Sequence, residues 1–197
     1  LISEAPARTA APYVPAGGWP KRIGALEPVG AVTLSSRDPA FGGFSAIALH
    51  DGRAMLLSDG GNVAAFAIRR GMIESPSGHI LKAGPATGWL RKDRDSESLT
   101  LDPATGRAWV GYENQNEIWR YAPGFSGAEA RAWPKGMRRW VANQGAESLV
   151  RLRDGRFIAI AERKPDRASR YALLFSGDPT ARGLSLIHIS EPTRQEA

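Results

Sequence analysis

The sequence lacks cysteine and has no apolar stretch long enough to cross a membrane. Without cysteine the chain has no disulfide bond, no thiolate metal site and no cysteine nucleophile, but its compartment stays open because exported proteins can also lack cysteine. The longest clean apolar runs, such as 63–68, have the length of a β-strand, so no membrane span is predicted. Any chemistry must therefore come from oxygen and nitrogen side chains.

Signatures of the common hydrolases and nucleotide-binding proteins are missing too. The sequence around Ser45 reads Gly-Phe-Ser-Ala-Ile and lacks the second glycine of a serine-hydrolase elbow. A Ser–His–Asp triad would have to use His50 or His79, because the third histidine, His188, lies in a C-terminal stretch of different composition. No glycine-rich phosphate loop or dinucleotide fingerprint occurs. These absences disfavour a serine hydrolase and a nucleotide-binding enzyme.

Basic residues exceed acidic ones, with 26 Lys and Arg against 20 Asp and Glu, and the formal net charge is +6. They are scattered among the acidic residues and not massed in one block, so no nucleic-acid binding is predicted. The excess suits the attraction of a small anionic substrate, and a generally arginine-rich composition explains it equally well.

Both ends of the chain differ in composition from the middle. The segment 1–21 is rich in proline and alanine, so we expect a loosely held arm of the kind that follows a removed signal peptide, and hence a periplasmic or secreted protein. The segment 184–197 contains Leu-Ser-Leu-Ile-His-Ile-Ser-Glu-Pro-Thr-Arg, which resembles a translated sequencing adapter. It is expected to be a non-native tail on a natural protein that continues beyond residue 183, which leaves 22–183 as the domain.

Turn residues are abundant, with 22 Gly and 14 Pro spread between short apolar segments. Three copies of one pattern begin near residues 44, 97 and 147: a β-prone run, a turn ending in Gly-Arg, and a second β-prone run that ends on a carboxylate. Ser45, Ser98 and Ser148 mark one position in each copy, at intervals of about 50 residues, which is the period of propeller blades. Further strands are predicted at 62–68, 79–82, 116–121, 129–133 and 170–175.

The predicted fold class is all-β. Four strands per unit indicate a partial β-propeller of about three four-stranded antiparallel blades, from a parent of about six blades. Leucine-rich and helical solenoids are disfavoured because Gly and Pro interrupt any apolar pattern of period 3.6. The chain is therefore expected to be part of a ring.

Carboxylates recur at matching places in the repeat. Asp93, Asp95 and Glu97 are two residues apart as the chain enters a strand, so their side chains are expected to share one face. Glu147 repeats Glu97, and the second strand of each copy ends on a further acid. Equivalent positions on successive blades meet around the axis of a propeller, and oxygen-only ligands suit calcium or magnesium. The predicted metal ligands are Asp59, Asp93, Asp95, Glu97, Glu113, Glu147 and Glu162.

Basic residues flank these acids, and arginine forks suit phosphate or carboxylate groups. The predicted substrate-binding residues are Arg91, Lys92, Arg94 and Arg138. The alternative interpretation is purely structural: the acids are solvated turn residues paired with these bases, and the repeated glutamates cap strands. Glu97 and Glu147 are the strongest candidates because the repeat selects each of them independently.

Several runs resemble the phytase-like family that is described as having esterase-like activity. The resemblance covers nearly all of 22–175 and is carried by the runs 38–45, 57–62, 88–99, 102–121 and 145–149. It implies a secreted or periplasmic β-propeller that hydrolyses ester or phosphoester bonds of a small anionic substrate with the help of calcium. Glu97 and Glu147 would then be catalytic, and Arg91, Lys92 and Arg94 would steady the anionic group.

Two other functions remain open. A non-enzymatic propeller that binds a protein or a polysaccharide would show no dependence on calcium. A lactonase-like propeller would also use a carboxylate-held metal, but it would normally add Asn and His ligands, which are scarce in this sequence.

Overall fold

The structure is a computed structural model, and it describes residues 8–69, 72–85, 94–162, 170–181 and 186–189. Apart from two short 3₁₀ helices, η1 (Pro123–Phe125) and η2 (Met137–Arg139), its regular elements are strands. Within these ranges no helix has the length and apolar character that crossing a bilayer requires. The strands are β1 (Arg8–Pro12), β2 (Val32–Ser36), β3 (Phe44–His50), β4 (Arg53–Ser58), β5 (Asn62–Arg69), β6 (Met72–Ile80), β7 (Ser96–Leu101), β8 (Ala108–Tyr112), β9 (Glu117–Tyr121), β10 (Ala128–Ala132), β11 (Ala146–Arg151), β12 (Phe157–Ala161), β13 (Ala172–Phe175) and β14 (Leu186–Ile189).

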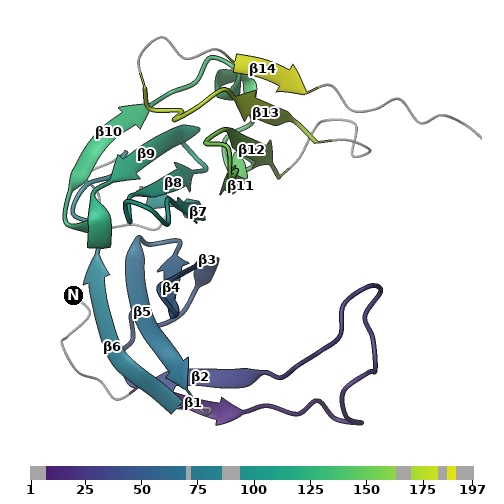
Figure 1. Ribbon diagram of the computed structural model, residues 1–197. Helices are drawn as coiled ribbons and strands as arrows, with labels where there is room; N and C mark the ends of the chain where they lie inside the picture. The colour runs from purple at the N-terminus through teal and green to yellow at the C-terminus, as the bar shows by residue number, and fades with distance from the viewer. Residues whose placement is uncertain (1–7, 70–71, 86–93, 163–169, 182–185, 190–197) are drawn as a thin grey trace, which may run out of the picture.

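Twelve of these strands form three antiparallel sheets of four, each built from consecutive strands: β3 to β6, β7 to β10, and β11 to β14. In Figure 1 the sheets fan out along an arc, and the first strand of each lies toward the inside of the arc. Four-stranded antiparallel sheets arranged radially are the blades of a β-propeller. The predicted all-β fold with three such blades is confirmed.

The blades are held together by apolar cores between their faces. All five residues of β8 are buried, because the second blade has a neighbour on both sides. Successive side chains of a strand point to opposite faces, so Trp109 packs in the core shared with Phe157 of the third blade, whereas Val110 packs with Leu57 of the first. Burial of a side chain of this size stabilises the fold by about 1.5–3 kcal/mol.

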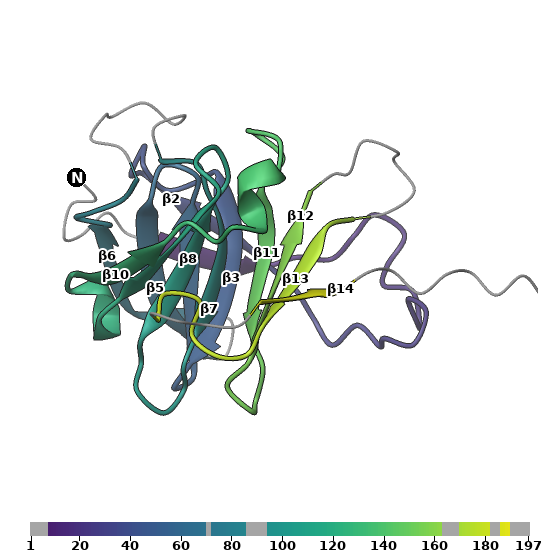
Figure 2. The same cartoon turned by 90° about the horizontal axis from the view of Figure 1, so that it is seen from above.

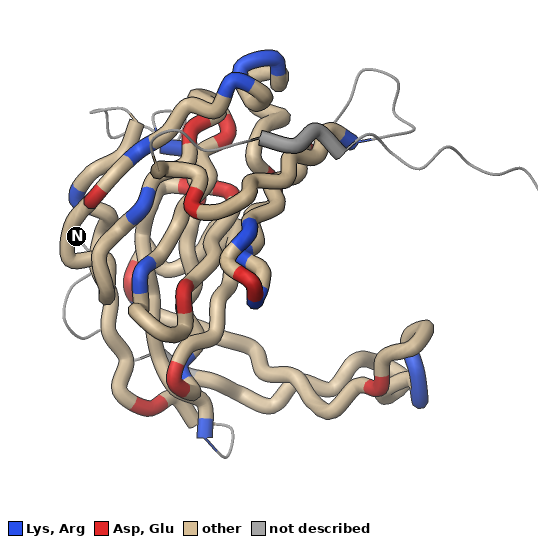
Figure 3. The backbone as a smooth tube through the Cα atoms, turned by 45° about the horizontal axis from the view of Figure 1, so that its top comes forward, with Lys and Arg blue, Asp and Glu red and all other residues tan. Residues whose placement is uncertain are grey.

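The predicted tight hairpin turn is confirmed at the Asp-Gly pair between β3 and β4. Asp51 and Gly52 have φ angles of 49° and 70° between β3 and β4, as a tight two-residue turn with two positive φ values requires. Charged positions of both signs are interspersed along the described backbone (Figure 3), in agreement with the scattered pattern in the sequence.

The register of the inner strands corrects the alignment of the repeat by one residue. Each inner strand carries a β-bulge, and the extra residues are Ser45, Glu97 and Glu147. These three positions are therefore equivalent, and Ser45 does not correspond to Ser98 and Ser148. An alignment that matches serine to serine misses this, because Ser45 is itself the bulged residue, whereas Ser98 and Ser148 each follow the bulged residue of their strand. The first blade thus has serine where the next two have glutamate.

Inner strands of neighbouring blades lie side by side (Figure 2) and are linked by serine hydroxyls. Ser45 Oγ donates to the carbonyl of Ser96, and Ser98 Oγ donates to the carbonyl of Ala146 at 2.7 Å. The bonds run from each blade to the next, so they set the spacing of the inner strands. They also fix the relative positions of the acidic residues at the strand ends.

Two segments outside the expected domain form strands. β1, within the proposed N-terminal arm, pairs with β2, and Pro12 stands at the strand end, where proline is tolerated. β14, within the proposed non-native tail, pairs with β13 and completes the third blade. Pairing through the backbone does not depend on a segment's origin, and isoleucines favour strands.

β6 begins at Met72, well before the predicted strand at 79–82. The sequence prediction missed the first part of this strand because its residues are mostly exposed and show no alternation of polar and apolar side chains.

Candidate acidic metal centre

Three acidic residues occupy one structural position in the three blades. Asp59, Glu113 and Glu162 each follow the second strand of a blade directly. Their backbone N–H groups donate to the carbonyls of Gly43, Asp95 and Gly145, at 3.1, 3.0 and 3.2 Å respectively. The backbone bond is the same in every blade, so it holds the three carboxylates at the same end of the propeller.

The bulges bring two more glutamates to this end. Glu97 and Glu147 are the extra residues of β7 and β11, and a bulge turns a side chain away from the regular alternation of its strand. Glu147 is exposed, whereas Glu97 is partly buried. Close packing of the blades supports this arrangement: a Cβ on Gly145 would lie 2.6 Å from the carbonyl oxygen of Glu113.

Asp95 lies just before β7 and is almost fully buried, with 4% of its surface exposed. It has a φ of 41°, a conformation that non-glycine residues adopt rarely and that aspartate tolerates better than most. Asn114 Nδ2 donates to its Oδ2 at 2.7 Å. Asn114 was missed by sequence reasoning, although its place directly after the repeated carboxylate Glu113 was a signal that could have found it.

Asp95, Glu97 and Glu113 form a compact cluster. One carboxylate oxygen from each lies within 4.8 Å of the others. Two oxygens bound to one calcium ion at 2.3–2.6 Å can be up to about 5 Å apart, so the three groups fit the coordination sphere of a single calcium ion. Hard, oxygen-only ligands are also the type that calcium and magnesium take.

The carboxylates act on one another electrostatically. Burial, followed by the charges of Asp59, Glu147, Asp95 and Glu113, raises the pKa of Glu97 to about 8. Burial and neighbouring negative charges both disfavour the ionised form of a carboxyl group, so the protonated form of Glu97 is favoured near neutral pH when no cation is bound.

Glu113 and Glu147 are shifted in the same direction. Burial and then Asp95, which is also a hydrogen-bond partner, raise the pKa of Glu113 to about 7, with Glu147 and Glu162 adding to the effect. Burial and then Glu162, Asp59 and Asp95 raise the pKa of Glu147. Six of the seven acids predicted as ligands, from three blades, therefore share one electrostatic environment.

The other predicted site residues are placed differently. Arg94 donates from Nη1 to the carbonyl of Leu81. The guanidinium of Arg138, in the middle of η2, lies over the ring of Trp133, 4.4 Å from its centroid, and Arg138 is exposed. Arg91, Lys92 and Asp93 lie outside the described residues. Thus the structure brings the acids together, and it holds Arg94 and Arg138 through other contacts.

Comparison with known proteins gives a family and a set of distant structural neighbours. Among solved structures, the chain is similar to the β-propeller domain of Cps50 (Swd1) from Myceliophteria thermophila, with 8% identity and a TM-score of 0.48 over 79% of this chain and 42% of that one. It is similar to the WD40 domain of Toxoplasma gondii coronin, with 8% identity and a TM-score of 0.47 over 89% of this chain and 41% of that one. It is also similar to PorZ of Porphyromonas gingivalis, with 16% identity and a TM-score of 0.48 over 93% of this chain and 26% of that one.

The chain spans less than half the length of each of these structures. No curated protein sequence matches it. The family model "Phytase-like: Esterase-like activity of phytase" matches residues 39–193, which is most of the chain and includes all three blades and the acidic cluster. This protein therefore belongs to the phytase-like family.

Proposed function

We propose that the acidic cluster binds a divalent cation, with calcium preferred, and that the whole propeller hydrolyses ester or phosphoester bonds of a small anionic substrate at this place. The observation that carries the proposal is the convergence of carboxylates from three successive blades, which raises the pKa of Glu97 to about 8 and of Glu113 to about 7. Such repulsion is relieved when a cation lies among the charges. The family description, esterase-like activity, names the class of reaction.

The residues divide into ligands and proton carriers by their burial. Asp95 and Glu113 are buried and would hold the cation together with Glu97. A bound divalent cation would supply charge stabilisation at the scissile group and lower the pKa of water. Glu147 is exposed beside this cluster, and burial followed by the charges of Glu162, Asp59 and Asp95 raises its pKa, so its carboxyl is proposed to carry the proton of the reaction.

The basic residues are proposed to bind the anionic group of the substrate. The guanidinium of Arg138 lies over the ring of Trp133 and the residue is exposed, so its N–H groups can approach a phosphate or carboxylate from solvent. Arg91, Lys92 and Arg94 precede Asp95 in the sequence and are proposed to act in the same way, Arg94 after exchange of its bond to Leu81.

The test is calcium binding by isothermal titration calorimetry, followed by hydrolysis of p-nitrophenyl phosphate and p-nitrophenyl acetate. Glu113→Gln should abolish calcium binding, because it removes a buried ligand, whereas the matched control Glu27→Gln at an exposed loop position should leave it unchanged. Glu147→Gln should keep calcium binding and lose hydrolysis.

Each outcome has a clear meaning. If the chain binds no calcium at millimolar concentration, or if Glu113→Gln binds it as well as the unaltered protein, the metal centre is refuted. Calcium binding without turnover on either ester, in a protein extended to a full propeller, would refute the hydrolase and favour a binding propeller. Faster turnover of lactones than of phosphoesters would favour the lactonase-like alternative.

A further inference from the structure

The two faces of the first blade are covered to different extents along β3. Successive side chains of a strand point to opposite faces. On the face toward the second blade, Ala46 and Ala48 pack against the core that the two blades share. On the other face, Ile47 and Leu49 are 63% and 75% exposed. The inner strand of the first blade thus has an apolar face that the described residues leave largely uncovered.

The N-terminal strands cover the outer part of the same face. Ile47 is paired directly with Leu56, so the two side chains lie on one face of the sheet. Leu56 is buried with Ala64 and Phe66, and Leu34 of β2 packs against this cluster. β1 lies against β6, the outermost strand of the blade. In Figure 1 β1 and β2 continue the arc of sheets beyond the first blade, with β2 on the inner side. They therefore take the place of the two outer strands of a further blade.

The repeat shows what covers this face in the other blades. Counted from the β-bulge, Leu99 and Leu149 occupy the position of Ile47. They are only 7% and 6% exposed, because each packs in a core shared with the preceding blade. The first two strands of that blade lie against them: β3 and β4 against β7, and β7 and β8 against β11. In this fold the position of Ile47 is therefore normally covered by an inner hairpin.

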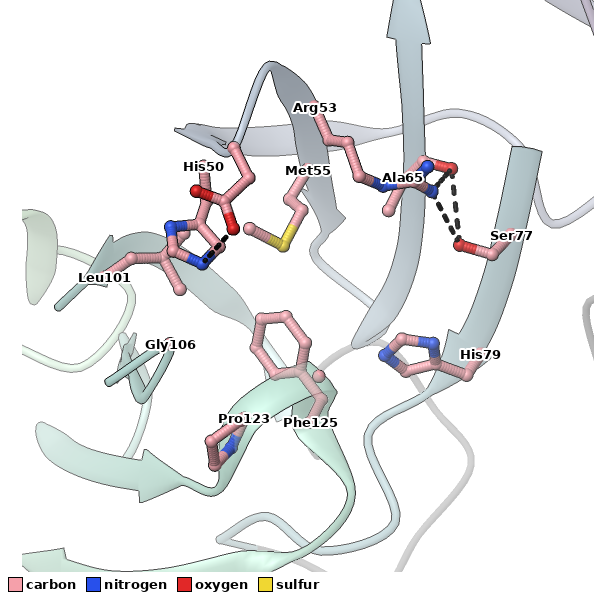
Figure 4. A pocket seen from close by; sticks show the side chains of 12 residues that line it. His50, Arg53, Met55, Ala65, Ser77, His79, Leu101, Gly106, Pro123 and Phe125 are labelled. Carbon is pink, nitrogen blue, oxygen red and sulfur yellow. Dashed lines mark hydrogen bonds and ion pairs between the residues drawn. The ribbon is translucent and has the colours of Figure 1, made fainter. Parts of the chain in front are cut away.

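The position of Leu49 gives the same result. Leu101 is its counterpart in the second blade. Leu101 lines a cavity that the first two blades enclose, together with Met55, His79 and Phe125 (Figure 4). Leu101 thus faces a neighbouring blade, whereas Leu49 is exposed.

β2 adds a backbone edge next to this apolar face. Among the described residues its only partner strand is β1. Just past the end of this pair, the N–H of Tyr13 donates to the carbonyl of Ala31 at 3.0 Å. Hydrogen-bonded pairs alternate along an antiparallel ladder, so the N–H groups of Val32 and Leu34 point away from β1. An edge of this kind is a template for another strand.

We propose that this face and this edge bind a two-stranded β-hairpin, which pairs with β2 through the backbone and packs apolar side chains on Ile47 and Leu49. The width follows from the other blades, which have four strands each, two of which β1 and β2 supply here. The source is the part of the protein expected after residue 183, so the blade is built from both ends of the whole propeller. None of these residues belongs to the acidic cluster, so the proposal does not depend on the proposed hydrolysis.

The probe is a synthetic hairpin with the sequence of 145–162, which contains β11 and β12. Leu149 and Ala159 face the second blade, so Val150 and Ile158 form an apolar surface on the opposite face of this hairpin. Cysteines added at both ends close the hairpin with a disulfide before binding, which removes the cost of ordering it. The protein itself has no cysteine that could exchange with this disulfide.

The fluorescein-labelled hairpin is titrated into the full chain, and binding is followed by fluorescence anisotropy. It should bind the unaltered protein, and Leu49→Asp should weaken binding about 10-fold or more, because a charge replaces an apolar contact. Val141→Asp, at an exposed apolar position after η2, is the matched control and should bind as the unaltered protein does. Both side chains are exposed, so circular dichroism should show that both variants fold.

A second measurement does not depend on a variant. In the unaltered protein the hairpin should slow amide hydrogen exchange in β2 but not in β14, the edge strand of the third blade. The proposal is overturned if the hairpin does not bind, if a folded Leu49→Asp protein binds it equally well, or if β2 gains no protection. It is also overturned if sedimentation velocity shows that the chain alone is a dimer that Leu49→Asp dissociates, because the occupant is then a second copy.

Discussion

Glu97→Gln should stabilise the metal-free protein at high pH, which is the reverse of what loss of a hydrogen-bonded carboxylate usually does. The pKa of Glu97 is raised from 4.5 to about 8 in the folded state, so the folded protein binds a proton more tightly than the unfolded chain does. Stability therefore falls as pH rises from about 4.5 to about 8 and is constant above that. Below about pH 4.5 both states are protonated, and the substitution should have no electrostatic effect.

The magnitude follows from the size of the shift. A shift from 4.5 to about 8 corresponds to an upper limit of about 5 kcal/mol at 1.36 kcal/mol per pH unit. Because Glu97 is only partly buried, solvent screens much of this repulsion, and about 1–2 kcal/mol is the expected gain for the glutamine variant at pH 9. Excess calcium should reverse the sign, because the variant then lacks a ligand.

The assay is urea denaturation followed by tryptophan fluorescence, at pH 5 and pH 9, with chelator and with calcium. Glu27→Gln is the control for the general effect of removing one negative charge from a basic protein. Equal stability of Glu97→Gln and the unaltered protein at pH 9 in chelator would show that the Glu97 carboxylate does not lie in a cluster of like charges.

Three further predictions concern the blades and the cation. Gly145→Ala should lower the free energy of unfolding by about 2–3 kcal/mol, because the added Cβ would lie 2.6 Å from the carbonyl oxygen of Glu113. In the control Gly127→Ala the added Cβ meets no atom within 4 Å, so the Tm should change little. Equal Tm values for the two variants would contradict the close packing at Gly145. Ser98→Ala should lower the free energy of unfolding by about 1–3 kcal/mol, because the buried carbonyl of Ala146 loses the 2.7 Å hydrogen bond from Ser98 Oγ. A Tm equal to that of the exposed control Ser126→Ala would refute this prediction. Calcium should raise the Tm more at pH 8.5 than at pH 5.5, because protons compete for Glu97 and Glu113; a shift independent of pH would exclude these carboxylates as ligands.

The blades could be predicted from the sequence, and the detail of the acidic site only partly. A period of about 50 residues and the paired acids follow directly from residue types. The equivalence of Ser45 with Glu97 could not be seen, because a β-bulge is a backbone feature that serine-to-serine alignment hides. Likewise, residue types do not show that Arg94 bonds to Leu81.

The cavity beside His79 was also beyond sequence reasoning. It is lined by residues of β3, β4, β5 and β6 of the first blade and of β7 and η1 of the second, and these segments are far apart in the chain. Strand pairing of 186–189 could not be expected either, since its neighbour β13 offers backbone groups to any segment of suitable length.

The most direct test of one shared cation site is the pKa of Glu97 measured by ¹³C NMR of its side-chain carboxyl, with chelator and with calcium. The carboxyl should titrate near pH 8 in chelator, and calcium should move this titration below pH 4.5 because the bound cation favours the charged form. Titration near pH 4.5 under both conditions would contradict the convergence of acids from neighbouring blades on one cation.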